Sequence, residues 1–161
     1  MAALAEMRRG ARLHREKSIA PFHPLILARL AEAEDEVGEI ESALATLDQA
    51  LAESEQSGQR WFDAELHRIR GDVRLRQNPS NSDSAEASFR AAIAVAQGQK
   101  TRSFELRAAL SLAKLYRATG READAHAALG PALEGFAPTP EFPEIEEAQA
   151  LSAGAVADAP L

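Results

Sequence analysis

The stretch LAEAEDEVGEIESALATLDQA at residues 30–50 decides the fold, because LAKLYRATGREADAHAALGPA at residues 112–132 repeats its pattern. The matching positions are Leu30, Ala31, Gly38, Ala43, Leu47 and Ala50 in the first copy and Leu112, Ala113, Gly120, Ala125, Leu129 and Ala132 in the second. A looser third copy between them consists of Gly71, Ala85, Phe89 and Ala92. Small residues at fixed places in two successive helices allow close helix–helix contact. A period of roughly 40 residues therefore predicts a stacked array of helical repeats and an all-α fold.

The composition supports one helical domain and excludes several classes of function. The chain has 161 residues, of which 45% are hydrophobic and only 5% aromatic, which favours closely packed helices over an aromatic-rich sheet core. The net charge is −7, so the chain as a whole lacks the excess of basic residues that is typical of a nucleic-acid-binding protein. The absence of cysteine excludes disulfides, thiolate metal sites and a cysteine nucleophile.

We expect no signal peptide and no membrane-spanning segment in the first part of the sequence. Residues 1–17 are rich in arginine and are not followed by an apolar core segment. The apolar run from Leu25 to Ala28 is far too short to cross a bilayer. We expect a soluble cytoplasmic chain without a membrane partner.

Apolar spacing and turn residues predict eight helices. They cover residues 2–17, 24–37, 39–57, 61–77, 83–97, 104–119, 121–134 and 144–152. Gly38, Gly58 and Gly120 are expected to end helices with left-handed turns. Ser82 or Asp83, and Ser103, are expected to cap the helices that follow them.

Laid out in this way, the chain resembles the tetratricopeptide repeats (TPR). That family uses antiparallel helix pairs with a small residue late in the first helix, a glycine at the turn and a small–large–small series in the second. The unit here is longer than the family's roughly 34 residues, since Ala43, Ala85 and Ala125 are spaced by 42 and 40 residues. The aromatic residue of the first helix is present only as Tyr116, whereas Glu34 and Arg74 stand at the matching places.

Longer units of this kind are similar to repeats at the carboxyl end of large bacterial signalling proteins. Those proteins combine an ATPase module with a nucleotide cyclase or a transcriptional activation domain. The similarity covers about residues 1–150 and is strongest in RWFDAELHR at residues 60–68 and SFELRAALSLA at residues 103–113.

The resemblance implies a right-handed superhelical array of antiparallel helix pairs over residues 1–153. Its expected parts are a leading helix at 1–17, repeats at 24–58, 61–97 and 103–135, a capping helix at 140–153 and a disordered tail at 154–161. The leading helix looks like the second helix of a repeat whose first helix is missing. Its uncovered face favours self-association.

Few residues suggest chemistry. The histidines, His14, His23, His67 and His126, form no i, i+4 pair and no HExxH motif. The segment from Gly98 to Thr101 departs from a phosphate-binding loop and is interpreted as a turn between repeats. The carboxylates at residues 32–36 and 144–147 are interpreted as solvated helix faces. Trp61 and Phe62 are either packing at a helix start or an anchor for a partner.

The expected binding surface is the concave groove that the resemblance assigns to the first helix of each pair. Its mapped residues are Ala28, Arg29, Glu32, Asp35 and Glu36, then Glu65, Arg68, Ile69, Asp72 and Arg76, then Arg107, Leu110, Ser111, Lys114 and Arg117. We hypothesise that the cations of the last two sets bind an acidic segment or a terminal carboxylate. The competing interpretation is solvated charge and ion pairs within the groove, such as Glu65 with Arg68. Chaperone-tail binding is not expected, because Ala28 and Glu32 occupy the places where the family's carboxylate clamp needs Lys and Asn.

We therefore predict a non-catalytic scaffold for protein–protein interaction in bacterial signalling, with no cofactor or metal, that binds a peptide or helix. The alternatives are a homodimerisation module and a small-ligand sensor. A cyclase or ATPase activity is not expected, because the chain has no catalytic motif for either. We further expect Arg107→Glu to weaken partner binding while leaving stability near that of the wild type.

Overall fold

The computed structural model describes residues 2–16, 22–80, 82–136 and 142–154, and these residues form an all-α chain. The helices are α1 (Ala2–Glu16), α2 (His23–Glu36), α3 (Ile40–Ser57), α4 (Asp63–Gln77), α5 (Asp83–Gln99), α6 (Arg102–Ala118), α7 (Glu122–Leu133) and α8 (Pro143–Ser152). Every described helix begins and ends within about two residues of its predicted bounds, and no described residue lies in a strand. The prediction of an all-α chain is confirmed.

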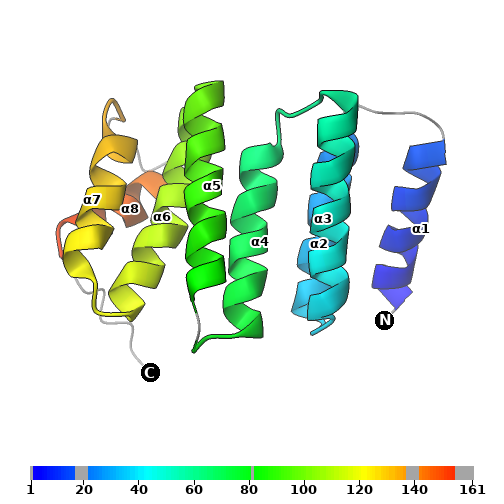
Figure 1. Cartoon of the computed structure of the whole chain (residues 1–161), viewed down its shortest axis with the longest axis horizontal. Coiled ribbons are helices and arrows are strands. Elements are labelled where there is room, and N and C mark those ends of the chain that lie inside the picture. Colours follow the sequence, from blue (N-terminus) through cyan, green and yellow to red (C-terminus); the bar gives the residue numbers. More distant parts are fainter. Residues whose placement is uncertain (1, 17–21, 81, 137–141, 155–161) are drawn as a thin grey trace.

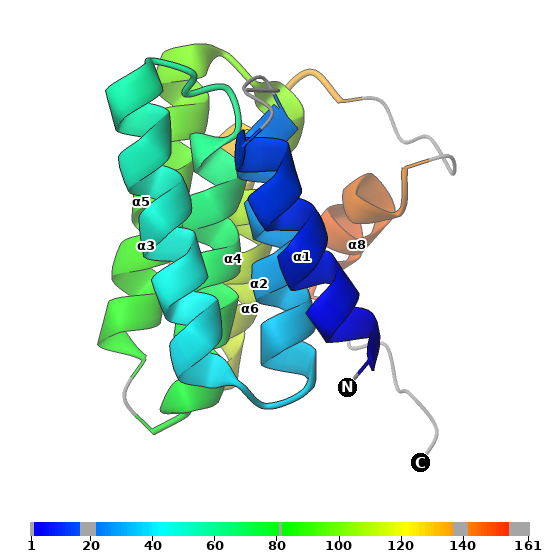
Figure 2. The same cartoon turned by 90° about the vertical axis from the view of Figure 1, so that its right-hand side faces the viewer.

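The helices stand side by side, with α1 at one end of the molecule and α7 and α8 at the other (Figure 1). Consecutive helices pack as α2 on α3, α4 on α5 and α6 on α7. Helix α4 also contacts both α2 and α6. At the two ends, α1 contacts α2 and α8 contacts α6. Seen from the end, α3 and α5 lie on one side of this row and α8 on the other (Figure 2). The row α2, α4 and α6 is called the central row below.

The repeated small–large–small residues lie in the core. Ala43, Leu47 and Ala50 of α3 are fully buried, and their counterparts in α5 and α7 are at most 2% exposed. Ala31 of α2 and Ala113 of α6 are also fully buried and belong to the same core clusters. Most core residues fall into two clusters, one built by α1 to α4 and one by α5 to α8.

Gly71 lies where α4 and α5 approach each other closely. A Cβ at this position would lie 2.4 Å from the Phe89 ring of α5. Glycine is required here because the ring occupies the space that any larger side chain would need. This explains why the middle copy has glycine where the other copies have alanine.

The turns at Gly38 and Gly120 are equivalent, as predicted. Their φ angles are 84° and 74°, in the left-handed region that favours glycine. In both turns the glycine N–H donates to the carbonyl three residues back, at 3.0 Å. The N–H of the residue after the glycine, Glu39 or Arg121, donates to the carbonyl five residues before it, at 2.8 Å. Both helices therefore end in the same motif.

Polar contacts repeat with the same period. At the start of α4, Arg60 pairs with Asp63, and at the start of α6, Arg102 pairs with Glu105, 42 residues further on. Between the paired helices, Glu34 accepts a hydrogen bond from Thr46 at 2.7 Å, and Arg74 donates to the equivalent Ser88 at 3.4 Å. The repeat is thus visible in the polar contacts as well as in the core.

Some predicted details are wrong. Helix α6 begins at Arg102 with Thr101 as its N-cap, so Ser103 lies inside the first turn and does not cap it. Ser82 occupies the N-cap of α5 but its side chain makes no capping hydrogen bond. Of the predicted tail at 154–161, residues 155–161 lie outside the described residues, as does the segment 137–141 between α7 and α8. Among the described helices, none combines the length and the apolarity that a membrane span requires.

Candidate partner-binding surface

The central row carries most of the charged residues mapped to the groove, and it joins them in a network of ion pairs. Arg29 pairs with Glu32 at 2.7 Å, and Glu32 lies 3.9 Å from Arg68 of α4. Arg68 also pairs with Glu65 at 3.1 Å and with Asp72 at 2.6 Å. Burial opposes the charge on Arg68, but the Glu65 and Asp72 carboxylates outweigh it and raise its pKa.

Glu65 is the buried centre of this network. Its side chain is 3% exposed and lies between Arg68 and Arg107, with Arg107 at 3.1 Å. Arg107 also approaches Glu144 of α8 at 3.9 Å, and Lys114 pairs with Glu147 of the same helix at 2.7 Å. The network therefore ties α4 to α6 and α6 to α8.

The remaining mapped residues lie outside this network. Arg76 pairs with Asp35 at 2.8 Å, and Arg117 pairs with Glu122 of α7 at 3.3 Å. Leu110 and Ala28 are 4% and 1% exposed, so both pack in the core rather than facing a ligand.

Each basic residue mapped to the groove thus has a carboxylate partner within the chain. This is the arrangement of the competing interpretation, and a ligand carboxylate would have to displace one of these partners. The expectation that Arg107→Glu leaves stability unchanged does not hold in this geometry. The substitution would place a second carboxylate beside the buried Glu65.

The acidic stretch at residues 32–36 is not a solvated helix face throughout, which corrects the sequence interpretation. Glu34 and Asp35 are 3% and 8% exposed. Glu34 accepts hydrogen bonds from Arg8 of α1 at 2.9 and 3.0 Å, in addition to the one from Thr46. It therefore ties together three helices, and its burial is compensated by hydrogen bonds.

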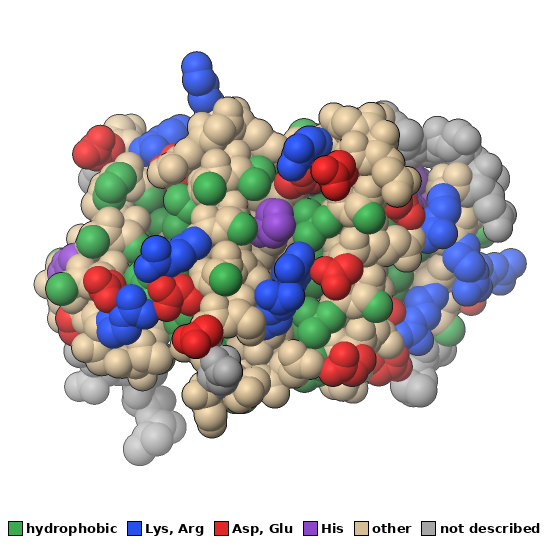
Figure 3. All heavy atoms as spheres, viewed as in Figure 1, with side chains coloured by type: hydrophobic (Ala, Val, Ile, Leu, Met, Phe, Trp, Pro, Cys, Tyr) green, Lys and Arg blue, Asp and Glu red, His purple; other side chains and the backbone are tan. Residues whose placement is uncertain are grey.

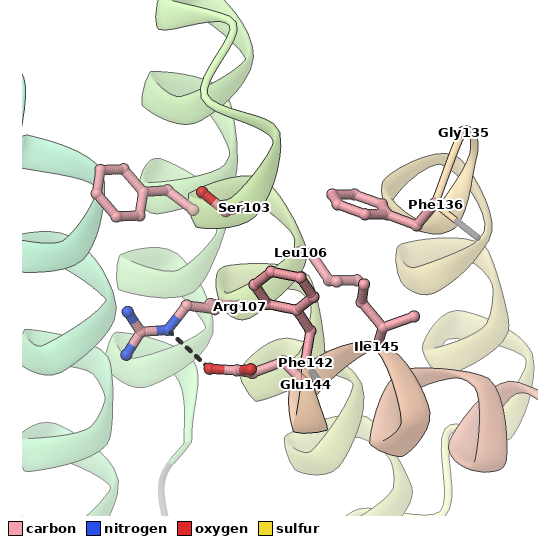
Figure 4. A pocket seen from close by; sticks show the side chains of 9 residues that line it. Ser103, Leu106, Arg107, Gly135, Phe136, Phe142, Glu144 and Ile145 are labelled. Atoms are coloured by element: carbon pink, nitrogen blue, oxygen red, sulfur yellow. Dashed lines mark ion pairs between the residues drawn. The ribbon is translucent and has the colours of Figure 1, made fainter. Parts of the chain in front are cut away.

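An apolar pocket of about 520 Å³ opens where α6, the end of α7 and the start of α8 meet (Figure 4). Its walls include Phe104 and Leu106 from α6, Phe136 after α7, and Phe142 and Ile145 at the start of α8. Figure 4 shows Arg107 and Glu144 at the edge of the pocket, joined by their ion pair. This volume falls in the range of about 300–1,000 Å³ that is typical of ligand pockets.

Aromatic side chains form a row that leads from the start of α2 to this pocket. The distances between neighbouring ring centroids are 6.3 Å from Phe22 to Trp61, 5.0 Å from Trp61 to Phe62 and 5.8 Å from Phe62 to Phe104. Phe62 is 8% exposed and Trp61 is 40% exposed. Phe62 therefore packs in the core, whereas Trp61 is accessible at the surface. The sequence signal for this row was a repeated spacing. Phe62 precedes Gly71 by the same number of residues as Phe104 precedes Ala113, the equivalent position of the next repeat.

A second apolar hollow of about 490 Å³ lies between α1 and α2, and its walls include Met7, Ala11 and Leu30. Met7 and Leu13 of α1 are 37% and 44% exposed. By contrast, acidic and basic side chains are interspersed over the face seen in Figure 3.

His14 of α1 and His23 of α2 lie against each other. The rings of His14 and His23 are stacked at 5.4 Å, and His23 Nε2 lies 3.1 Å from Glu53 of α3. Burial lowers the pKa of His23, and Glu53 only partly opposes this effect. Within the described part of the chain, no group of three or more His, Asp or Glu residues is arranged to hold a metal ion.

Comparison with known proteins finds a curated relative but no matching family profile. No protein-family profile matches the sequence. An uncharacterized protein of Rhizobium meliloti (strain 1021) is 30% identical over 117 residues, which are 73% of this chain and 11% of the relative. The chain therefore spans about a tenth of the length of that relative.

Proposed function

We propose that this chain is a non-catalytic protein-interaction module built from TPR-like repeats, and that it binds a peptide segment at the pocket between α6 and α8. The proposal includes a right-handed superhelix of antiparallel helix pairs, a cytoplasmic location and a role in bacterial signalling. The buried stripes, turns and polar contacts that recur at one period support the repeat architecture. The match to part of a much longer relative supports the comparison with multidomain proteins.

The observation that carries the proposal is the combination of three phenylalanines around one open pocket with Arg107 at its edge. Phe142 is 57% exposed, so apolar surface is available to a partner without rearrangement of the core. Interfaces are commonly anchored by an apolar side chain that fills such a pocket. The expected ligand places an aromatic or large aliphatic side chain among Phe104, Phe136 and Phe142.

The expected ligand also carries a carboxylate next to its apolar anchor. Arg107 is held firmly by Glu65 at 3.1 Å but only loosely by Glu144 at 3.9 Å. A carboxylate of the partner takes the place of Glu144 while Glu65 keeps its pair. This narrows the candidate cations of the groove to Arg107, whose second carboxylate partner, Glu144, is easily displaced.

A peptide-display selection tests this proposal. A random library is selected on the wild type, and the enriched peptides are compared for binding to Phe142→Asp and Phe22→Asp. Both phenylalanines are N-caps and both are 57% exposed, but only Phe142 lines the pocket. Aspartate is favourable at an N-cap, so neither change is expected to disrupt its helix.

The proposal predicts enriched peptides with an apolar residue beside Asp or Glu that bind Phe22→Asp but lose binding to Phe142→Asp. Glu144→Gln should strengthen binding, because it frees the second side of Arg107. A selection without enrichment, or one whose peptides bind both aspartate variants equally, would contradict the proposal.

A small-ligand sensor is the second candidate, and the pocket volume of about 520 Å³ favours it. It predicts a saturable rise in melting temperature with a single metabolite. Self-assembly is the third candidate, favoured by the exposed Met7 and Leu13 on α1. Light scattering across a hundredfold range of concentration tests it through the solution mass.

A further inference from the structure

A small acidic pocket lies between α2 and α4, away from the apolar pocket at α8. Its volume is about 120 Å³, and it is lined by Glu32, Asp35, Glu36, Ile69, Asp72 and Arg76. Four carboxylates thus surround the pocket together with one arginine. The side chain of this arginine, Arg76, is 58% exposed.

Among the carboxylates that line this pocket, Asp35 has a buried oxygen without a hydrogen-bond donor. The residue is 8% exposed, and its Oδ1 atom is buried without a hydrogen-bond donor. Its Oδ2 atom lies 2.8 Å from Arg76. A buried carboxylate oxygen without a donor is costly, and burial accordingly raises the pKa of Asp35 despite Arg76.

Asp72 lines the same pocket from α4, and its pKa is also raised. Burial is the main cause and Glu65 adds to it, whereas Arg68 at 2.6 Å, Arg76 and Lys114 oppose it. Arg68 is shared among Glu65, Asp72 and Glu32, so it does not compensate any of them fully. The pocket therefore has room and charge for one additional cation.

The lining indicates which kind of cation. Ile69 is 4% exposed and provides an apolar wall beside the carboxylates. An ammonium group is a compact charge with three donors on a flexible apolar stem, whereas a guanidinium requires a planar, bidentate arrangement. We propose that the pocket between α2 and α4 binds an alkylammonium group, with the ammonium donating to Asp35 Oδ1 and the stem packing on Ile69.

Two sources carry this group, a lysine side chain of a protein and a free diamine. The site is separate from the peptide pocket at α8, and its test uses small ammonium ions alone. Its outcome is therefore independent of the function proposed above.

The test is a titration of the isotope-labelled chain with n-butylammonium chloride, followed by the backbone amide signals at constant ionic strength. We expect saturable changes in the signals of residues 32–36 and 69–76. Asp35→Asn should weaken binding by about tenfold or more, because it removes the charged acceptor. Asp48→Asn is the control, since Asp48 lies on α3, is 63% exposed and pairs with Arg70.

Arg76→Gln is expected to change the affinity for the ammonium ion in the opposite direction to Asp35→Asn. It removes the cation that competes for Asp35, so it should tighten binding several-fold. Comparing N-acetyl-lysine methylamide with putrescine then shows which source binds more tightly. Changes that stay linear with concentration in the wild type, or equal affinity in the wild type and Asp35→Asn, would overturn the proposal.

Discussion

At the scale of single residues, Gly71 is the position where the repeat pattern has its sharpest physical consequence. Gly71→Ala would bring a methyl group within 2.4 Å of the Phe89 ring. The ring is almost fully buried and belongs to the core cluster of α5 to α8. We expect the substitution to lower the free energy of unfolding by about 1–3 kcal/mol. Urea denaturation followed by circular dichroism measures this change.

Gly98→Ala is the matched control for this prediction. Gly98 also lies within a helix, α5, but a Cβ there meets no atom within 4 Å. Alanine is a better helix former than glycine, so the variant should be more stable by about 0.5–1 kcal/mol. Equal effects of the two substitutions would contradict the crossing at Gly71.

The histidines His23 and His67 predict how stability depends on pH. Burial lowers the pKa of both below 6.5 in the folded state. Between that folded pKa and 6.5, the unfolded chain binds more protons than the folded chain. Stability is therefore complete above pH 6.5 and falls as the pH drops through this window. Asp35 and Asp72, whose pKa values are raised, act with the opposite sign at lower pH.

The measurement is the melting temperature at about pH 7.5 and about pH 5.5. His67→Gln should reduce the difference between the two, because it removes one of the groups that take up a proton on unfolding. His126→Gln, at an exposed position, should keep the difference seen in the wild type. A melting temperature of the wild type that rises on acidification would refute this assignment.

At the scale of the elements, Arg102 fastens the start of α6 to the end of α7. Its Nη2 atom donates to the carbonyl oxygens of Pro131, Ala132 and Glu134 at 3.1, 3.2 and 2.6 Å. A cation at a helix C-terminus also compensates the helix dipole. Arg102→Met keeps an apolar stem but loses these bonds, and we expect a loss of about 1–2 kcal/mol in thermal unfolding.

Arg12→Met on α1 removes an exposed arginine and serves as the control. Its effect should stay within about 0.5 kcal/mol. If both substitutions cost the same, the contacts of Arg102 with α7 do not contribute to stability.

The helices could be predicted from the sequence because their signals are local. Gly38 and Gly120 end helices through their own backbone conformation, and the apolar spacing in α3 and α6 repeats within a few residues. The capping prediction for Ser103 was wrong because the chain turns two residues earlier, at Thr101. Pro131 lies within α7 without ending it.

The sites were less predictable because they depend on residues that are distant in sequence. Glu34 is buried by an arginine 26 residues away, and Glu65 pairs with Arg107, which is 42 residues away. The apolar pocket requires Phe104, Phe136 and Phe142 to meet at the junction of three helices. None of these contacts follows from a helical period, so the burial of the acidic stretch and the pocket both appear only in three dimensions.

At the scale of the whole molecule, the ionic network and the aromatic row both run along the helices α2, α4 and α6. Both end near the pocket at α8, where Phe142 and Glu144 come from the last helix. The central claim is that a partner peptide docks at this end of the row. Arg107 and Phe104 belong to the network and to the row, respectively, and both line the pocket.

The most direct test maps a selected peptide onto the chain by changes in its backbone amide signals. The account predicts that the largest changes fall at residues 103–107, 135–136 and 142–145, and that Phe142→Asp abolishes them while Phe22→Asp does not. Changes centred on α1, or spread over α3, α5 and α7, would contradict it.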